Sequence, residues 1–201
     1  MTKITGVDRR DALGLFVATG AAAMMSATET SAGAVSDAAG RSARRGASSD
    51  WDWLVGTWDV RHRKLRERLV QSQDWFEFDG SCTNWPLLDG RGNVDDNVFY
   101  TPEETYRGVG IRAFDPETGL WAIWWLDSRA PTKLDVPVRG GFENGVGIFL
   151  AEDTWNGTPI TVRFRWSDIT ENSATWDQAF STDGGASWES NWVMYFSRRR
   201  A

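Results

Sequence analysis

Apolar and polar residues alternate with a period of two through most of the chain beyond its first quarter. The clearest run places Ile160, Val162, Phe164 and Trp166 on one face, and the three residues between them are polar. Successive side chains of a β-strand point to opposite sides, so this alternation indicates a strand with one buried face. We therefore expect a series of short antiparallel strands. The segments 121–125 and 188–196 alternate in the same way, and the segment 145–151 is apolar on both faces.

Short stretches rich in Gly, Asn and Asp separate the alternating segments. Residues of these types favour turns, and no long helical pattern intervenes. The segment 63–71 is compatible with a short helix or with the exposed end of the first strand. The pattern predicts an all-β antiparallel up-and-down domain with little helix, closed as a barrel or folded as a sandwich. The turn-like segments are 115–119, 143–145, 156–157, 170–172 and 183–185.

Residues 1–34 are organised like an export signal. Arg9-Arg10 precedes the uncharged stretch 13–27, and Ala32-Gly33-Ala34 offers the small residues at which a signal peptidase cleaves. The arginine pair resembles a twin-arginine signal, and a disordered or helical arm of a cytoplasmic protein is the alternative. The stretch is too short and too weakly apolar for a membrane-spanning helix. We expect a cleaved signal and a periplasmic or secreted protein.

The segment 35–50 has the composition of a linker. It consists mostly of Ser, Ala, Gly and Arg, and such a stretch cannot bury enough apolar surface to offset its chain entropy. The folded domain is therefore expected over 51–201. That part holds 16 basic and 23 acidic residues, so the acidity of the chain belongs to the domain.

The overall composition excludes several classes of function. The net charge is -6 and the isoelectric point is about 4.9, which argues against a nucleic-acid-binding surface. One Cys and one His exclude an internal disulfide, a zinc finger and any cofactor that needs several such ligands. Cys82 is expected to be a small buried apolar residue. The oligomeric state has no signature in the sequence.

Gly56-Thr57-Trp58 at the start of the first expected strand resembles the Gly-x-Trp motif of the calycin superfamily, which includes the lipocalins. In those proteins the Trp packs under one end of the barrel, and an Arg of the last strand lies over the indole. Arg198, Arg199 and Arg200 follow the last expected strand here. A guanidinium in that place stacks on the ring and also binds backbone carbonyls.

The stretch from Trp53 to Phe196 is similar to an uncharacterised bacterial lipocalin-like family. The matching segments include WLVGTWDVRHRKLRERL, GNVDDNVF, WWLDSR, VRFRWSDIT and WDQAFSTDGGASWE. The resemblance implies a lipocalin-like barrel. It implies no catalytic residue.

Three polar residues are candidates for catalysis or ligand binding. If Trp58 points into the barrel, Val60 and His62 share its interior face, and an interior His is a candidate acid, base or haem ligand. A bulge between Trp58 and His62 would instead turn the imidazole outward. Asp127 and Arg129, which follow the expected strand 120–126, are predicted to reach the barrel mouth together.

Thirteen tryptophans are more than a barrel of this size can bury in a fully packed core. One interpretation is that some of them line a pocket for an apolar or planar ligand, and the other is that they fill the interior and cap hairpins; the two are not exclusive. The expected wall of such a pocket consists of Trp58, Val60, Trp121, Trp125 and Trp192.

Three further motifs have structural explanations. The segment 181–188 matches the Asp-box of sialidases, Ser-x-Asp-x-Gly-x-x-Trp, but a single copy favours a hairpin turn over a glycosidase propeller. The acidic segment 92–97 is expected to be a loop, and it lacks the periodic ligands of a calcium-binding EF-hand. Asp177 is expected to pair with Arg163 or Arg165 across neighbouring strands.

Two functions follow from these features. The first is an exported barrel that binds a small apolar or aromatic ligand, with no cofactor required and haem as one possible ligand. The second is a metal-independent acid–base enzyme, such as a lyase, isomerase or hydratase, that uses His62, Asp127 and Arg129. The surroundings of His62 distinguish the two best, since an enzyme needs it in the cavity beside a carboxylate or Arg.

Overall fold

The computed structural model describes residues 49–200. The expected signal segment 1–34 and nearly all of the expected linker lie outside these residues. Trp51, at the start of the expected domain, is buried. Asp50 just before it accepts hydrogen bonds from two indoles, through its backbone carbonyl from Trp53 and through its carboxylate from Trp121.

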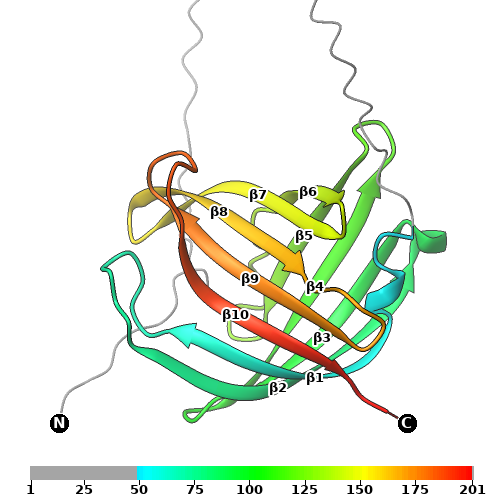
Figure 1. Cartoon of the computed structure of the whole chain (residues 1–201), viewed down its shortest axis with the longest axis horizontal. Helices are drawn as coiled ribbons and strands as arrows, with labels where there is room; N and C mark the ends of the chain where they lie inside the picture. The colour runs from blue at the N-terminus through cyan, green and yellow to red at the C-terminus, as the bar shows by residue number, and fades with distance from the viewer. Residues whose placement is uncertain (1–48, 201) are drawn as a thin grey trace, which may run out of the picture.

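Ten antiparallel strands close into a barrel, in which each strand pairs with its neighbours in the chain and the last strand pairs with the first (Figure 1). This confirms the all-β, up-and-down architecture expected from the alternation, and the closed, calycin-like barrel that the Gly-x-Trp resemblance implied. The described residues contain no α-helix, only the short 3-10 turns η2 (Asp52–Leu54) and η3 (Leu88–Gly90). The strands are β1 (Gly56–Leu65), β2 (Trp75–Leu87), β3 (Gly92–Tyr100), β4 (Thr105–Asp115), β5 (Leu120–Asp127), β6 (Val138–Glu143), β7 (Val146–Trp155), β8 (Thr158–Ser167), β9 (Ser173–Ser181) and β10 (Glu189–Arg198).

Local structure differs from expectation in two places. The acidic segment 92–97 is not a loop but the first part of β3, with every second residue buried. In β10 a bulge between Ser190 and Trp192 breaks the expected alternation. Ser190 therefore bonds to the Asp177 carboxylate, while Asn191 and Trp192 contact interior side chains. The segment 63–71 begins as strand, since β1 continues to Leu65.

One end of the barrel is closed by indole rings, and we call it the closed end. Trp58 is fully buried, and its indole N–H donates to the Leu54 carbonyl at 2.8 Å. The Arg198 guanidinium lies 4.1 Å from the centre of that ring and donates to the Val55 carbonyl at 2.8 Å. This is the arrangement expected from the Gly-x-Trp resemblance. In Figure 1, η2 and the end of β10 lie together at this end.

The opposite end, which we call the open end, carries the β1–β2 and β9–β10 loops (Figure 1). The wall is weakest between β5 and β6, where only three residue pairs form, Trp121–Ile123 against Val138–Gly140. Beyond Ile123, the segment 128–137 runs beside β5 with one isolated bridge, between Leu126 and Leu134.

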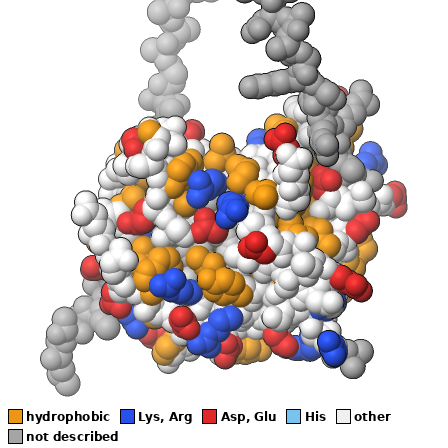
Figure 2. Space-filling view, viewed as in Figure 1, with side chains coloured by type: hydrophobic (Ala, Val, Ile, Leu, Met, Phe, Trp, Pro, Cys, Tyr) orange, Lys and Arg blue, Asp and Glu red, His pale blue; other side chains and the backbone are white. Residues whose placement is uncertain are grey.

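The outer face over β7–β10 mixes hydrophobic side chains with charges of both signs (Figure 2). Ile148, Leu150 and Tyr195 are exposed, and Arg163 pairs with Asp177 at 3.6 Å, as predicted. Within residues 49–200 the structure has no helix of the length and apolarity needed to cross a membrane.

Candidate functional site

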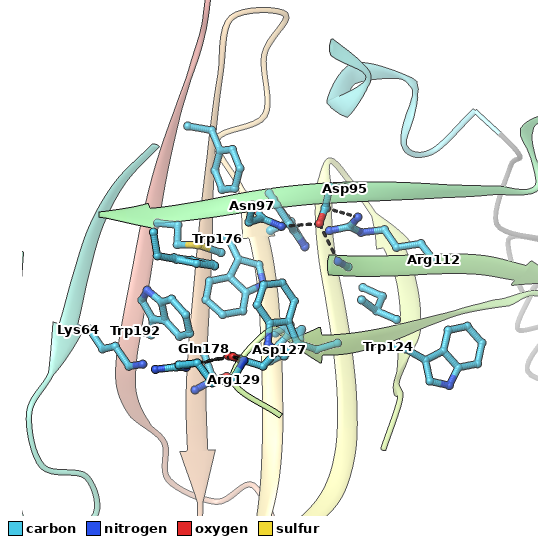
Figure 3. A pocket seen from close by; sticks show the side chains of 18 residues that line it. Lys64, Asp95, Asn97, Arg112, Trp124, Asp127, Arg129, Trp176, Gln178 and Trp192 are labelled. Atoms are coloured by element: carbon cyan, nitrogen blue, oxygen red, sulfur yellow. Dashed lines mark hydrogen bonds and ion pairs between the residues drawn. The ribbon is translucent and has the colours of Figure 1, made fainter. Parts of the chain in front are cut away.

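A cavity inside the barrel lies toward the open end. The cavity has a volume of about 70 Å³ accessible to water. Since one water needs about 10–15 Å³ by this measure, the cavity has room for several waters or for a ring system of similar size. Eight of its eighteen lining residues are aromatic, and charged residues lie at two places (Figure 3). The lining residues are Lys64, Asp95, Asn97, Phe99, Gly110, Arg112, Ile123, Trp124, Trp125, Asp127, Arg129, Phe164, Trp166, Trp176, Gln178, Trp192, Met194 and Phe196.

The first charged group, which we call the mouth cluster, consists of Lys64, Asp127 and Arg129. Arg129 donates two hydrogen bonds to the Asp127 carboxylate, from Nε at 2.9 Å and from Nη2 at 2.8 Å. Its guanidinium also lies 3.7 Å from the centre of the Tyr106 ring, and the Lys64 ammonium lies 4.1 Å from that of Trp192. Each cation thus lies on the face of an aromatic ring, which stabilises positive charge where water is partly excluded. Figure 3 shows the three side chains together on one side of the cavity.

The second charged group, which we call the floor network, is centred on the buried pair Asp95 and Arg112. The two side chains form an ion pair, and the Gly110 N–H and the Asn97 amide also donate to the Asp95 carboxylate, at 2.9 and 2.6 Å. Arg112 donates further to Asn93 at 3.0 Å. The network ties β3 to β4. Charges buried this deeply persist only when they are paired and hydrogen-bonded, as they are here.

Two glycines of β4 make room for these interior groups. A Cβ on Gly108 would collide with the Trp125 indole, and a Cβ on Gly110 would lie 2.6 Å from the Asp95 carboxylate oxygen. Both glycines face inward, so the missing side chains let Trp125 and Asp95 extend across the strand. The cavity wall thus depends on residues that lack a side chain.

His62 is buried at 2% exposure beside the cavity and is not one of the residues that line it. Its ring stacks on Phe78 at 4.5 Å between centroids, and its Nδ1 accepts a hydrogen bond from the Trp192 indole N–H at 3.3 Å. Burial lowers the pKa of this imidazole to about 3, with a smaller contribution from the charge of Lys64. His62 is therefore neutral at pH 7 and holds Trp192, which forms part of the cavity wall.

This position does not suit a haem ligand. Nδ1 is engaged by Trp192, and Nε2 lies against β2, where a Cβ on Gly80 would be only 2.6 Å away. An iron approaching either nitrogen would have to displace Trp192 or strand β2. The residues around His62 therefore do not fit a haem bound through this side chain.

The structure brings some of the predicted site residues to the cavity and places others elsewhere. Trp125, Trp192, Asp127 and Arg129 line it. Trp58, Val60 and Trp121 are buried in the core cluster that includes the closed end and do not belong to the lining. Trp58, Val60 and His62 do share the interior face of β1, as the alternation predicted.

Sequence reasoning missed Lys64, Asp95, Arg112 and Gln178 as lining residues. Lys64 follows His62 at the same period of two, so the alternation that placed His62 inside also predicts Lys64 inside. Asp95 was assigned to a loop, although the spacing of Asn93, Asp95 and Asn97 is that of one strand face. For Lys64 the available signal was a polar residue on an otherwise apolar face, and for Asp95 it was the period of two that Asn93, Asp95 and Asn97 share.

The Asp-box segment is a hairpin turn between β9 and β10, as predicted. Asp183 accepts hydrogen bonds from the Ser187 N–H at 2.9 Å and the Ser187 hydroxyl at 2.6 Å, which lower the pKa of its carboxyl to about 2. Gly184 and Gly185 adopt positive φ, and the Trp188 indole donates to the Gly185 carbonyl at 3.0 Å. The motif closes a loop on the outside of the barrel.

Cys82 is buried in the hydrophobic core, as predicted, and burial raises the pKa of its thiol. Among residues 49–200, no group of three or more His, Cys, Asp or Glu side chains is placed to hold a metal ion.

No family model matches the chain, and no curated protein matches it. Eight chains of solved structures match its fold, among them the following two. The S-type phycobiliprotein lyase CPES from Guillardia theta aligns with a TM-score of 0.53 at 9% identity, over 79% of this chain and 95% of that one. A redesigned β-barrel aligns with a TM-score of 0.42 at 12% identity, over 75% of this chain and 96% of that one. At such identities the comparison with the lyase supports the barrel fold and nothing finer.

Proposed function

We propose that this barrel binds a small, largely aromatic molecule in the cavity at its open end. The observation that supports this best is the distribution of chemistry around the cavity. Phe99, Trp125, Trp176 and Trp192 form aromatic walls, while the charged groups are confined to the mouth cluster and the floor network. Ligand pockets typically combine apolar walls with a few placed polar groups.

We favour binding over acid–base catalysis. The imidazole of His62 is neutral, lies behind Trp192 and uses Nδ1 to hold that ring. Asp127 is held by both Nε and Nη2 of Arg129, an arrangement that stabilises the carboxylate rather than freeing it as a base. The structural neighbour is named as a lyase, and its name is compatible with either a binding or a catalytic use of such a barrel.

The test is calorimetric titration of the full-length protein with the neutral aromatic amide 2-naphthamide. Ile123 is buried in the cavity wall and Ile148 is exposed on the outer face of β7, so Ile123→Trp and Ile148→Trp form a matched pair. We expect binding to the wild type and to Ile148→Trp. We expect a loss of at least tenfold, about 1.4 kcal/mol, in Ile123→Trp, where the new indole occupies the cavity.

Thermal melting of both variants accompanies the titration, because an oversized side chain in a core also costs stability. Absence of binding to the wild type would overturn the proposal. Equal affinity in the two folded variants would place the amide somewhere other than the cavity and would overturn it as well.

A further inference from the structure

The side-chain amide of Asn97 brings an unpaired hydrogen-bond acceptor to the cavity. Its nitrogen, Nδ2, donates to the Asp95 carboxylate at 2.6 Å and to the Gly108 carbonyl at 3.4 Å. Both of these neighbours are acceptors, so they fix which end of the amide is the nitrogen and which is the oxygen. The oxygen, Oδ1, accepts no hydrogen bond from any residue within 49–200.

This oxygen is shielded from bulk water but borders the cavity. Asn97 is 7% exposed and lines the cavity from the inward face of β3, beside Asp95 (Figure 3). The amide oxygen of Asn84 is also unpaired, but it is sealed among protein atoms, whereas that of Asn97 is not. A shielded acceptor of this kind gains most from a donor that a ligand brings to it.

Aromatic rings surround the approach to Asn97. Phe99 lies two residues further on the same face of β3, about 7 Å along the strand. Its ring contacts those of Trp125 and Trp192, with centroids 5.9 and 5.8 Å apart. Asn97 pairs with Gly108 of β4, whose missing side chain leaves room for the Trp125 indole. An aromatic ligand that lies against these walls can therefore direct a substituent toward Asn97.

The neighbouring charges favour an uncharged donor. The carboxylate that Asn97 contacts belongs to Asp95, which forms an ion pair with Arg112 and accepts the Gly110 N–H. A cationic ligand would meet a carboxylate that is already engaged, and it would approach the Arg112 guanidinium. A carboxylate ligand has no donor to offer to an amide oxygen.

We propose that the ligand is an uncharged aromatic molecule whose polar end carries an N–H or O–H group, as in an amide or a phenol, and that this group donates a hydrogen bond to Asn97 Oδ1. The inference rests on the proposed function and adds the chemical class of the ligand. Asn97 then determines specificity, because an analogue without the donor leaves a buried oxygen unpaired.

The test compares 2-naphthamide with methyl 2-naphthyl ketone by calorimetric titration of the full-length protein. The two molecules share the ring system and the carbonyl group, and the ketone has a methyl group where the amide has NH₂. The ketone is the more apolar of the two, so burial of apolar surface alone would favour it. We expect the wild type to bind the amide at least tenfold more tightly than the ketone.

Two leucine variants test whether Asn97 is the acceptor. Asn97→Leu removes the oxygen and should abolish the preference for the amide. Asn84→Leu is the matched control, because Asn84 is buried and donates to Asn93 at 2.9 Å but does not line the cavity. It should keep the wild-type preference. Thermal melting shows whether each variant folds.

Each result bears on one of the two proposals. Equal wild-type affinities, or tighter binding of the ketone, would overturn the donor on the ligand and leave the aromatic cavity intact. A preference that survives in Asn97→Leu, or that is lost in Asn84→Leu as well, would overturn the role of Asn97. Absence of binding by both ligands would overturn the proposed function, and this inference with it. If Asn97→Leu does not fold, the wild-type comparison still decides whether the ligand needs a donor.

Discussion

The two ends of the barrel use the same residue types for different purposes. At the closed end the rings of Trp51, Trp58 and Trp121 contact neighbouring indole or phenyl rings, with centroids 4.9 to 6.2 Å apart. At the open end the ring of Trp192 instead faces the cavity and carries the Lys64 ammonium. Cations lie over indole rings at both ends, so what distinguishes the open end is that Trp192 borders the cavity, whereas Trp58 and Trp121 are enclosed by the core.

Aromatic residues thus stabilise the closed end of the barrel and form a cavity wall at its open end. The closed end tolerates a cost in hydrogen bonding, since the indole N–H groups of Trp51 and Trp166 are buried without a partner among the described residues. At the open end the corresponding polar groups have hydrogen-bond partners. There Trp192 has a hydrogen-bond acceptor in His62, and Asp127 and Arg129 satisfy each other. Precise orientation is needed where a ligand binds, and hydrogen bonds supply it.

The largest effect is expected at the closed end. Replacement of Trp58 by Ala removes a fully buried indole, its bond to Leu54 and the ring beneath the Arg198 guanidinium. We expect the free energy of unfolding to fall by about 3–5 kcal/mol. The measurement is urea denaturation followed by circular dichroism.

The control for this prediction is Trp85→Ala, because Trp85 lies on β2 and is 48% exposed. Its loss should stay below about 1 kcal/mol, as for surface substitutions. Similar losses at the two positions would mean that the closed end is no more tightly packed than the outer surface, and the contrast between the two ends would fail.

The floor network lies between the two ends, and an intermediate effect is expected there. Asp95→Leu leaves the Arg112 guanidinium buried without its carboxylate, although Asn93 and the faces of Trp51 and Trp166 remain in contact with it. We expect a loss of about 3 kcal/mol, at the lower end of the range for breaking a buried pair. Urea denaturation measures it.

The double variant Asp95→Leu/Arg112→Met tests whether the loss of stability comes from the unpaired charge of Arg112. It removes both charges and keeps the side chains long and apolar, so most of the lost stability should return. A double variant as unstable as the single one would show that the network stabilises the barrel through its hydrogen bonds to Asn97 and Gly110 rather than through charge balance.

Alternation and turn residues are local signals and were sufficient for the antiparallel strands, and the Gly-x-Trp resemblance added the closed barrel. The sequence predicted the interior face of β1, the hairpin at Asp183 and the Arg over Trp58. The site was harder to predict. The bulge near Trp192 depends on pairing with β9, and the depth of the cavity depends on Gly108 and Gly110, whose role is to leave space for side chains from other strands.

The sequence also left open whether His62 takes part in chemistry. Alternation predicts to which side of the strand a side chain points, but not which residues surround it. Both candidate functions required only that the side chain point inward. What decides is the set of contacts, namely Phe78 on one side, Trp192 on Nδ1 and the backbone of Gly80 near Nε2. These residues are distant from one another in the chain, and no spacing rule brings them together.

The smallest effect is expected at His62 and depends on pH. The pKa of the His62 imidazole is lowered from 6.5 to about 3 in the folded protein. Between pH 6.5 and pH 3 the unfolded chain therefore binds a proton at His62, and the folded chain does not. Protonation therefore favours unfolding, and the stability that His62 contributes is fully present above pH 6.5 and is lost as the pH falls toward 3. Between pH 7 and pH 5 we expect this residue alone to cost about 2 kcal/mol.

His62→Phe isolates that contribution, since a phenyl ring can stack on Phe78 and does not titrate. All other titrating groups are common to the two proteins, so the difference between their unfolding free energies at pH 7 and at pH 5 belongs to His62. The wild type should lose more stability than the variant over this range. Parallel losses would mean that the imidazole accepts a proton in the folded state, and that its bond from Trp192 gives way. The open end would then be more hydrated than its burial indicates, and acid–base chemistry at His62 would regain its support.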